Sequence, residues 1–80
     1  MAILRANVPA FRQFMERRGW SERELSEHMG LAYSYVNRVL SGKRQPGSKF
    51  VAGSLLIGLT MDEAFIIDVS HGAGPEPGSG

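Results

Sequence analysis

Cysteine is absent from this 80-residue chain, which excludes a disulfide framework, a thiolate metal site and a thiol nucleophile. Long hydrophobic runs are also absent. The longest uncharged stretch, residues 50–61, is interrupted by glycine, serine and threonine and is far shorter than the roughly 20 apolar residues of a membrane span. The N-terminus lacks the basic and then apolar pattern of a secretory signal. A chain of this length forms one domain, too small for a doubly wound sheet or a barrel enzyme.

Lysine and arginine are missing from the second part of the chain. Residues 1–49 carry nine basic and four acidic side chains, a net charge of +5. Residues 50–80 carry four acidic side chains and no basic ones, a net charge of −4. The total of +1 therefore conceals a basic half that could face an anionic partner, and the alternative is a mixed, solvated surface.

Capping residues and glycines mark the ends of the first two expected helices. Asn7 can cap a first helix that ends at Gly19. Ser21 and Glu24 have the spacing of a capping box, in which the serine hydroxyl and the glutamate carboxylate each accept a free backbone N–H. This second helix ends at Gly30, where a left-handed residue can turn the chain sharply.

Three further helices are expected, and no segment is a convincing strand. The third covers about residues 32–40 and the fourth about 48–57, while a second capping box at residues 60–63 opens a short fifth helix. The sequence thus predicts an all-α domain. We expect an N-terminal arm over residues 1–7, a folded domain over residues 8–70, and a disordered tail or linker stub over residues 71–80.

The segment from Trp20 to Pro46 is typical of a helix-turn-helix: a capped helix, a glycine turn and a short helix with an exposed polar side. It resembles the XRE family of phage lambda repressor-like and Cro-like DNA-binding domains. The residues that carry the resemblance are Ser21, Glu24-Leu25, Met29-Gly30-Leu31, Ser34-Tyr35-Val36, Gly42-Lys43-Arg44 and Pro46. The chain departs from the family pattern at Glu22, which is commonly glutamine, at Ser26, commonly alanine, and at the first recognition-helix positions.

The resemblance implies a compact five-helix domain that binds double-stranded DNA in transcription regulation, for example as a repressor. Such domains commonly bind palindromic operators as homodimers, with the recognition helix, here about residues 32–40, in the major groove. It further implies a cytoplasmic protein associated with a bacterial or phage nucleoid. We expect no enzyme activity and no cofactor, because neither a nucleophile with its base nor a metal-ligand spacing around the two histidines is present.

Candidate DNA contacts follow from side-chain chemistry on the third helix and the basic loop. Asparagine pairs with adenine in the major groove, serine suits either base type, alanine touches a thymine methyl, and arginine binds guanine or phosphate. The candidate base contacts are Ala32, Tyr33, Ser34, Asn37 and Arg38. The candidate phosphate contacts are Ser21, Tyr35, Lys43, Arg44 and Lys49.

The apolar residues of the expected fifth helix leave two interpretations open. Phe65, Ile66 and Val69 supply either a dimer contact or the end of a small core. A second function class also stays open, a protein-interaction module on a helix-turn-helix fold that no longer binds DNA. The acidic second half of the chain and the negative charge of Glu22 favour that alternative.

Overall fold

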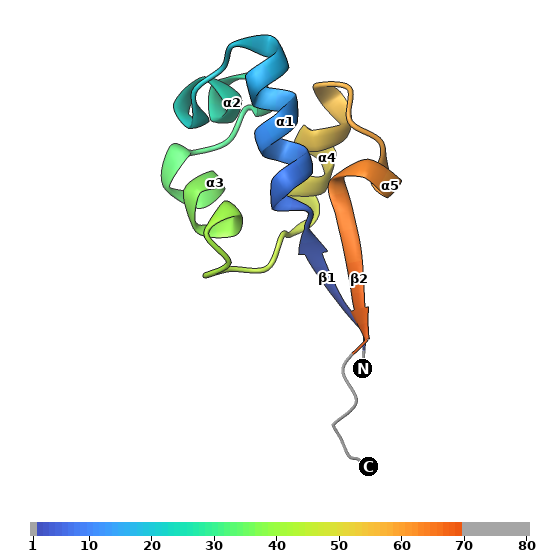
Figure 1. Cartoon of the computed structure of the whole chain (residues 1–80). Coiled ribbons are helices and arrows are strands. Elements are labelled where there is room, and N and C mark those ends of the chain that lie inside the picture. The colour runs from blue at the N-terminus through green and yellow to red at the C-terminus, as the bar shows by residue number, and fades with distance from the viewer. Residues whose placement is uncertain (1, 70–80) are drawn as a thin grey trace, which may run out of the picture.

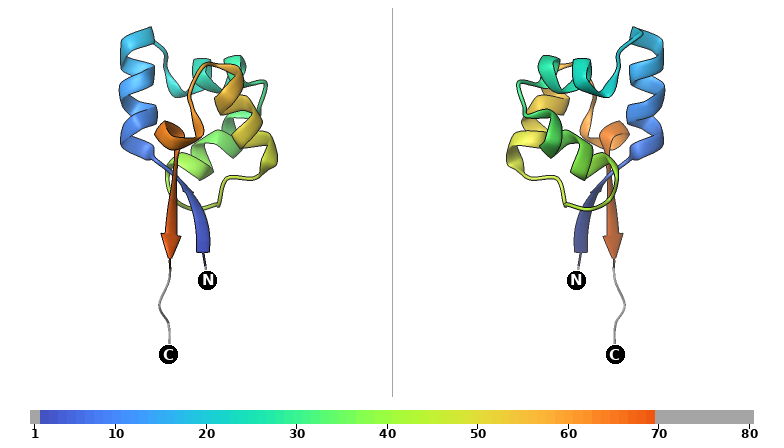
Figure 2. Two further views of the ribbon diagram at one scale, coloured as in Figure 1. Left: turned by 90° about the vertical axis from the view of Figure 1, so that its right-hand side faces the viewer. Right: turned by 90° about the vertical axis from the view of Figure 1, so that its left-hand side faces the viewer.

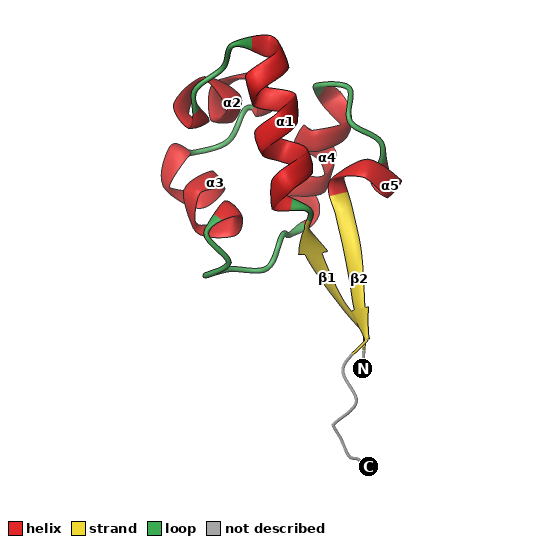
Figure 3. Cartoon of the chain, viewed as in Figure 1, coloured by secondary structure: helices red, strands yellow, loops and turns green. Residues whose placement is uncertain are grey.

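A computed structural model describes residues 2–69 of the chain, and the expected tail over residues 71–80 lies outside the described residues. Within residues 2–69 the fold is mostly helical, with one small sheet (Figures 1 and 3). The elements in chain order are β1 (Ala2–Ala6), α1 (Val8–Arg18), α2 (Glu22–Met29), α3 (Tyr33–Leu40), α4 (Ser48–Leu56), α5 (Met61–Ala64) and β2 (Phe65–Val69). None of these helices is long and apolar enough to cross a bilayer.

The helix starts read from the sequence are confirmed by their hydrogen bonds. The side chain of Asn7 accepts from the backbone N–H of Ala10 at 3.3 Å, and α1 begins at Val8, directly after Asn7. At α2, the Ser21 hydroxyl accepts from the Glu24 N–H at 3.1 Å, while the Glu24 carboxylate accepts from the Ser21 N–H at 2.8 Å. These bonds satisfy N–H groups that have no partner inside the helix, which is why each helix starts where it does.

The core lies between the helices and is dominated by aromatic and aliphatic side chains. Phe11 of α1 and Phe50 of α4 are fully buried, with ring centroids 5.3 Å apart, and Phe65 closes the cluster 6.2 Å from Phe50. Leu25 of α2 and Val36 of α3 are also fully buried. Each such side chain contributes roughly 1.5–3 kcal/mol relative to exposure, so burial of one side of each helix holds the bundle together.

The expectation of an all-α chain is wrong at both ends of the described segment. β1 and β2 pair as an antiparallel ribbon, with Ala2 opposite Val69 and Ala6 opposite Phe65. The fifth helix ends at Ala64, whose carbonyl accepts from the Asn7 N–H at 2.8 Å. This bond links the chain where β1 ends to the chain where β2 begins, next to the helices. The ribbon extends away from the helices (Figures 1 and 2).

The composition of β2 explains the change from helix to strand. Ile66, Ile67 and Val69 are β-branched, and such side chains lose rotamer freedom in a helix but fit a pleated strand. Residues 2–6, expected as an arm, supply the partner strand. An ion pair between Arg5 and Asp68, 2.8 Å between Nε and Oδ2, adds a cross-strand contact.

Candidate nucleic-acid interface

α2 and α3 form the expected helix-turn-helix, and the turn between them depends on Gly30. Its φ of 72° lies in the left-handed region, where a Cβ would cost roughly 1–2 kcal/mol. Leu31 then donates its N–H to the Ser26 carbonyl at 2.9 Å, which closes the end of α2. Ser26, the departure from the family's alanine, is buried, and its hydroxyl donates to the Arg23 carbonyl at 2.6 Å. The substitution is therefore accommodated without an unsatisfied polar group.

α3 separates a buried side from an exposed one. Val36, Val39 and Leu40 are buried against the other helices, which fixes the rotation of α3 about its own axis. All five candidate base contacts are exposed: Ala32 occupies the N-cap position, and Tyr33, Ser34, Asn37 and Arg38 lie on α3. The side expected to read DNA is therefore free of core contacts, although base contact itself stays a prediction.

Asn37 is held by a neighbour that the sequence analysis did not connect with it. Its Nδ2 donates to Oε1 of Glu22 on α2 at 2.7 Å. The other carboxylate oxygen of Glu22, Oε2, accepts from a guanidinium N–H of Arg12 on α1 at 2.8 Å. The Glu22 side chain is only 15% exposed, compared with 50% for Arg12. One carboxylate thus joins α1, the start of α2 and the exposed side of α3.

The two tyrosines of α3 are each covered by an arginine. The guanidinium of Arg23 lies 4.5 Å from the ring centroid of Tyr33, and that of Arg44 lies 5.0 Å from the ring centroid of Tyr35. The Tyr35 hydroxyl accepts from the Gly47 N–H at 3.0 Å, and among residues 2–69 its own proton is donated to no other group. Cation–π contacts of this kind limit the side-chain entropy that would be lost on binding a partner.

A surface hollow brings together segments from the helix-turn-helix, the basic loop and α4. Its lining comes from the turn before α3, from α3 itself, from the basic loop and from the beginning of α4, and consists of Gly30, Leu31, Ala32, Tyr35, Arg44, Gly47, Ser48 and Lys49. Arg44 and Lys49 place two positive charges at this hollow, next to the N-terminus of α3. The candidate phosphate contacts Tyr35, Arg44 and Lys49 are therefore brought together.

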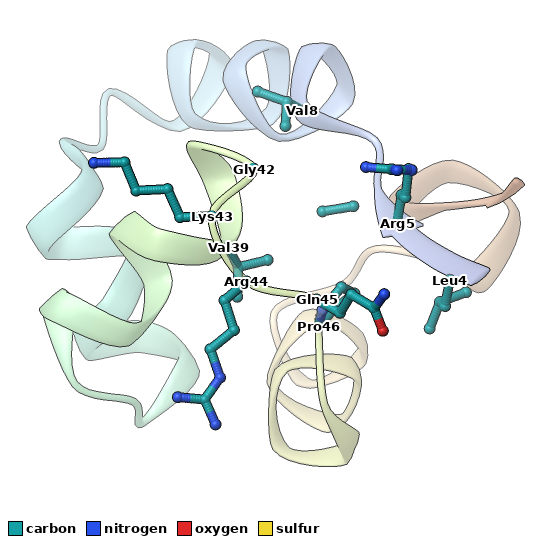
Figure 4. A pocket seen from close by; sticks show the side chains of 10 residues that line it. Leu4, Arg5, Val8, Val39, Gly42, Lys43, Arg44, Gln45 and Pro46 are labelled. Atoms are coloured by element: carbon teal, nitrogen blue, oxygen red, sulfur yellow. The ribbon is translucent and has the colours of Figure 1, made fainter.

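Lys43 is placed differently from Arg44, although the two are adjacent in the chain. Lys43 and Arg44 both line a second hollow, between β1 and the loop that follows α3, but their charged ends point away from its centre and from each other (Figure 4). The inner wall of this hollow includes Val8 and Val39, which are apolar. The basic loop therefore presents its two cations in different directions.

Ser21, the remaining candidate phosphate contact, is exposed at the start of α2. Its N–H is already donated to the Glu24 carboxylate, and its hydroxyl oxygen accepts from the Glu24 N–H. The backbone N–H of Ser21, and after it the Ser21 side chain, hold the pKa of the Glu24 carboxyl below its ordinary value. Glu24 therefore keeps its negative charge, which favours the helix start and opposes a phosphate close to it.

The expected dimer residues do not share one surface. Phe65 is only 6% exposed and packs edge-on against Phe11 and Phe50, so it belongs to the core. Ile66 and Val69 would lie on one side of a helix, but in a strand, where alternate residues face opposite sides, they point to opposite faces. Of the two interpretations left open, Phe65 agrees with the end of the core, whereas Ile66 and Val69 are exposed on opposite faces of the ribbon.

Sequence reasoning also missed Arg12 and Ile67. Ile67 is 61% exposed and lies on the same ribbon face as Val69. The alternation of a strand would have identified it, had the segment been read as a strand. The unusual glutamate at position 22 was the available signal for the contact with Asn37, because a carboxylate close to a DNA-reading surface needs a compensating partner.

Comparison with known proteins agrees with this geometry. A family model described as helix-turn-helix matches residues 11–52, more than half of the chain, from Phe11 in α1 into α4. Neither the curated proteins nor the solved structures contain a match to the chain. The matched region includes α2, the Gly30 turn and α3, which together form the helix-turn-helix. The chain therefore belongs to the XRE-type helix-turn-helix family, a family of DNA-binding regulators.

Proposed function

We propose that the protein binds double-stranded DNA sequence-specifically and regulates transcription, with α3 in the major groove. The observation that carries the proposal is the hollow in which the beginning of α3 meets Arg44 and Lys49. A helix whose first turns face base edges needs phosphate-binding groups beside it, because phosphate contacts set the register and base contacts set the sequence. We propose that the protein acts in the cytoplasm, associated with a bacterial or phage nucleoid.

The roles proposed for the individual side chains follow from their positions. Tyr33, Ser34 and Asn37 face the bases from the first turns of α3, with Ala32 at its start and Arg38 reaching a base or a phosphate. The phosphate backbone is bound by the other set, Ser21, Tyr35, Lys43, Arg44 and Lys49. Each neutralised phosphate releases counterions, so affinity is expected to fall steeply with salt.

Selection from random duplex DNA, followed by salt titration on the enriched site, tests this function. We expect enrichment of a defined site and a loss of about 1–3 kcal/mol of specific binding in Asn37→Ala, without loss of folding. The control is Glu27→Ala, which alters an exposed residue of α2 whose side chain makes no hydrogen bond among residues 2–69. The absence of any enrichment at low salt would refute DNA reading and favour a protein-interaction module.

We further propose that two copies associate through the β1–β2 ribbon. Residues directly opposite in an antiparallel pair share a face. One face is entirely apolar, whereas the other carries the Arg5–Asp68 ion pair. The outer part of the apolar face is exposed, 61% at Ile67 and 55% at Val69. An isolated two-stranded ribbon is marginally stable in water, so covering this face with the same face of a second copy would stabilise both. The apolar face consists of Ala2, Leu4, Ala6, Phe65, Ile67 and Val69.

The dimer proposal is tested by placing a charge on each face in turn. Ile67→Lys should convert the dimer to a monomer in sedimentation equilibrium, because it buries an unpaired charge at the contact. Ile66→Lys is the matched control, since Ile66 is also exposed, at 48%, but lies on the opposite face. Equal effects of the two variants, or a wild-type protein that stays monomeric on a palindromic site, would refute this contact.

A further inference from the structure

The contacts of Glu22 with Arg12 and Asn37 affect which DNA base α3 can bind. This inference rests on the proposed DNA binding and deepens it. An asparagine amide offers an acceptor, Oδ1, and two N–H donors, and rotation by half a turn about its terminal bond exchanges them. The base that an asparagine prefers therefore depends on what determines the orientation of its amide.

Glu22 determines that orientation because an ionised carboxylate can only accept. Its Oε1 lies 2.7 Å from Nδ2 of Asn37. In the rotated amide two acceptor oxygens would face each other across this short distance, with a charge on one of them. The contact is therefore available to one orientation only, in which Oδ1 of Asn37 and its second N–H point away from Glu22.

Arg12 keeps the carboxylate in this position. It binds the second oxygen, Oε2, at 2.8 Å, so that Oε1 stays directed at Asn37. Its positive charge also offsets the negative charge of Glu22, which would otherwise repel a nearby phosphate. With only 15% of its side chain exposed, Glu22 is little accessible to water that could replace either partner.

We infer that Glu22 and Arg12 are positioning residues that make Asn37 selective for adenine over guanine. The outward Oδ1 requires a donor, and the second N–H requires an acceptor. Adenine offers both in the major groove, as N6–H and N7. Guanine offers two acceptors, O6 and N7, so one of them would face Oδ1. Cytosine offers a donor alone, and thymine offers no donor at all.

The test measures base preference at one position of the selected site. That position is the one at which Asn37→Ala abolishes the preference. For the wild-type protein we expect adenine there, favoured over guanine by roughly 5- to 150-fold in affinity. In Glu22→Gln the preference should fall towards that of Asn37→Ala, because a glutamine amide can donate as well as accept and no longer excludes the rotated asparagine.

Two matched controls separate positioning from charge. Glu27→Gln makes the same charge change on α2 outside the network, and it should leave the adenine preference intact. Arg12→Gln should reduce the preference, whereas Arg17→Gln, which removes a charge from an exposed residue of the same helix, should only weaken binding to all sequences. Thermal unfolding confirms that each variant is folded.

The outcomes distinguish this inference from the function on which it rests. A wild-type protein that enriches no site refutes DNA reading and the inference together. An enriched site whose adenine preference is unchanged in Glu22→Gln, or reduced equally in Glu27→Gln, overturns the inference and leaves DNA reading intact. Guanine at the position that depends on Asn37 overturns it as well.

Discussion

Replacement of Gly53 by alanine is expected to destabilise the protein, although the same change in an exposed helix would stabilise it. Gly53 is buried in α4. A Cβ built there would lie 3.0 Å from the Cβ of Met29 and 3.0 Å from the Met29 carbonyl oxygen at the end of α2. At this point the backbone of α4 thus lies directly against both the backbone and the side chain of Met29 in α2.

Two opposing effects decide how much Gly53→Ala changes the free energy of unfolding. Alanine gains about 1 kcal/mol over glycine in a helix interior. Overpacking costs about 1–3 kcal/mol, and here the upper part of that range applies because a backbone carbonyl cannot rotate out of the way. The free energy of unfolding should therefore fall by about 1–2 kcal/mol, which corresponds to a Tm lower by roughly 4–16 °C for a domain of this size.

Urea unfolding followed by circular dichroism measures the difference. Ala52→Gly provides the control, since Ala52 is the exposed neighbour in α4 and its change reports helix propensity alone, a loss of about 1 kcal/mol. If Gly53→Ala raised the free energy of unfolding by about 1 kcal/mol, the close approach of α2 and α4 would be refuted.

Three further predictions concern the start of α2 and the basic loop. Ser21→Ala should lower the free energy of unfolding by about 1 kcal/mol in urea titration, because the α2 cap is lost. The pKa of Glu24 is lower in the folded state than in the unfolded state, so its carboxylate stabilises the fold above the unfolded-state pKa. This stabilisation is lost as pH falls through the folded-state pKa. The free energy of unfolding should therefore fall less steeply with acid in Glu24→Gln than in the wild-type protein. Arg44→Gln should weaken specific and non-specific DNA binding alike and reduce the salt slope by about one unit, and an unchanged slope in fluorescence titration would place Arg44 away from the phosphates.

The range of each interaction along the chain explains what could be predicted from the sequence. The capping box at Ser21 and Glu24 spans three residues, so it is visible as a local pattern and fixes the start of α2. The ribbon depends on pairs such as Arg5 and Asp68, which are 63 residues apart. Nothing near either residue specifies its partner, and the β-branched residues of β2 therefore looked like one side of a helix.

In the candidate interface, too, local features could be predicted from the sequence, whereas contacts between distant residues could not. That α3 exposes Asn37 and buries Val36 follows from helical periodicity, and the structure agrees. The hydrogen bond between Asn37 and Glu22 does not follow from periodicity, because the two residues are 15 positions apart and meet only through the angle between α2 and α3. That angle depends on a left-handed glycine turn whose presence is readable but whose resulting geometry is not.

The structure also changes the meaning of the chain's small net charge. Glu22 is paired with Arg12, and Asp68 with Arg5, so two of the negative charges are neutralised by neighbours instead of opposing an anionic partner. At the hollow beside α3, by contrast, Arg44 and Lys49 have no ion pair among residues 2–69. With few such cations in each copy, a single domain neutralises few phosphates, and each phosphate adds only about 0.9 to the salt slope. Two copies joined through the ribbon would double that number without any added charge, so a near-neutral chain and tight, salt-sensitive DNA binding are compatible when the binding unit is a dimer.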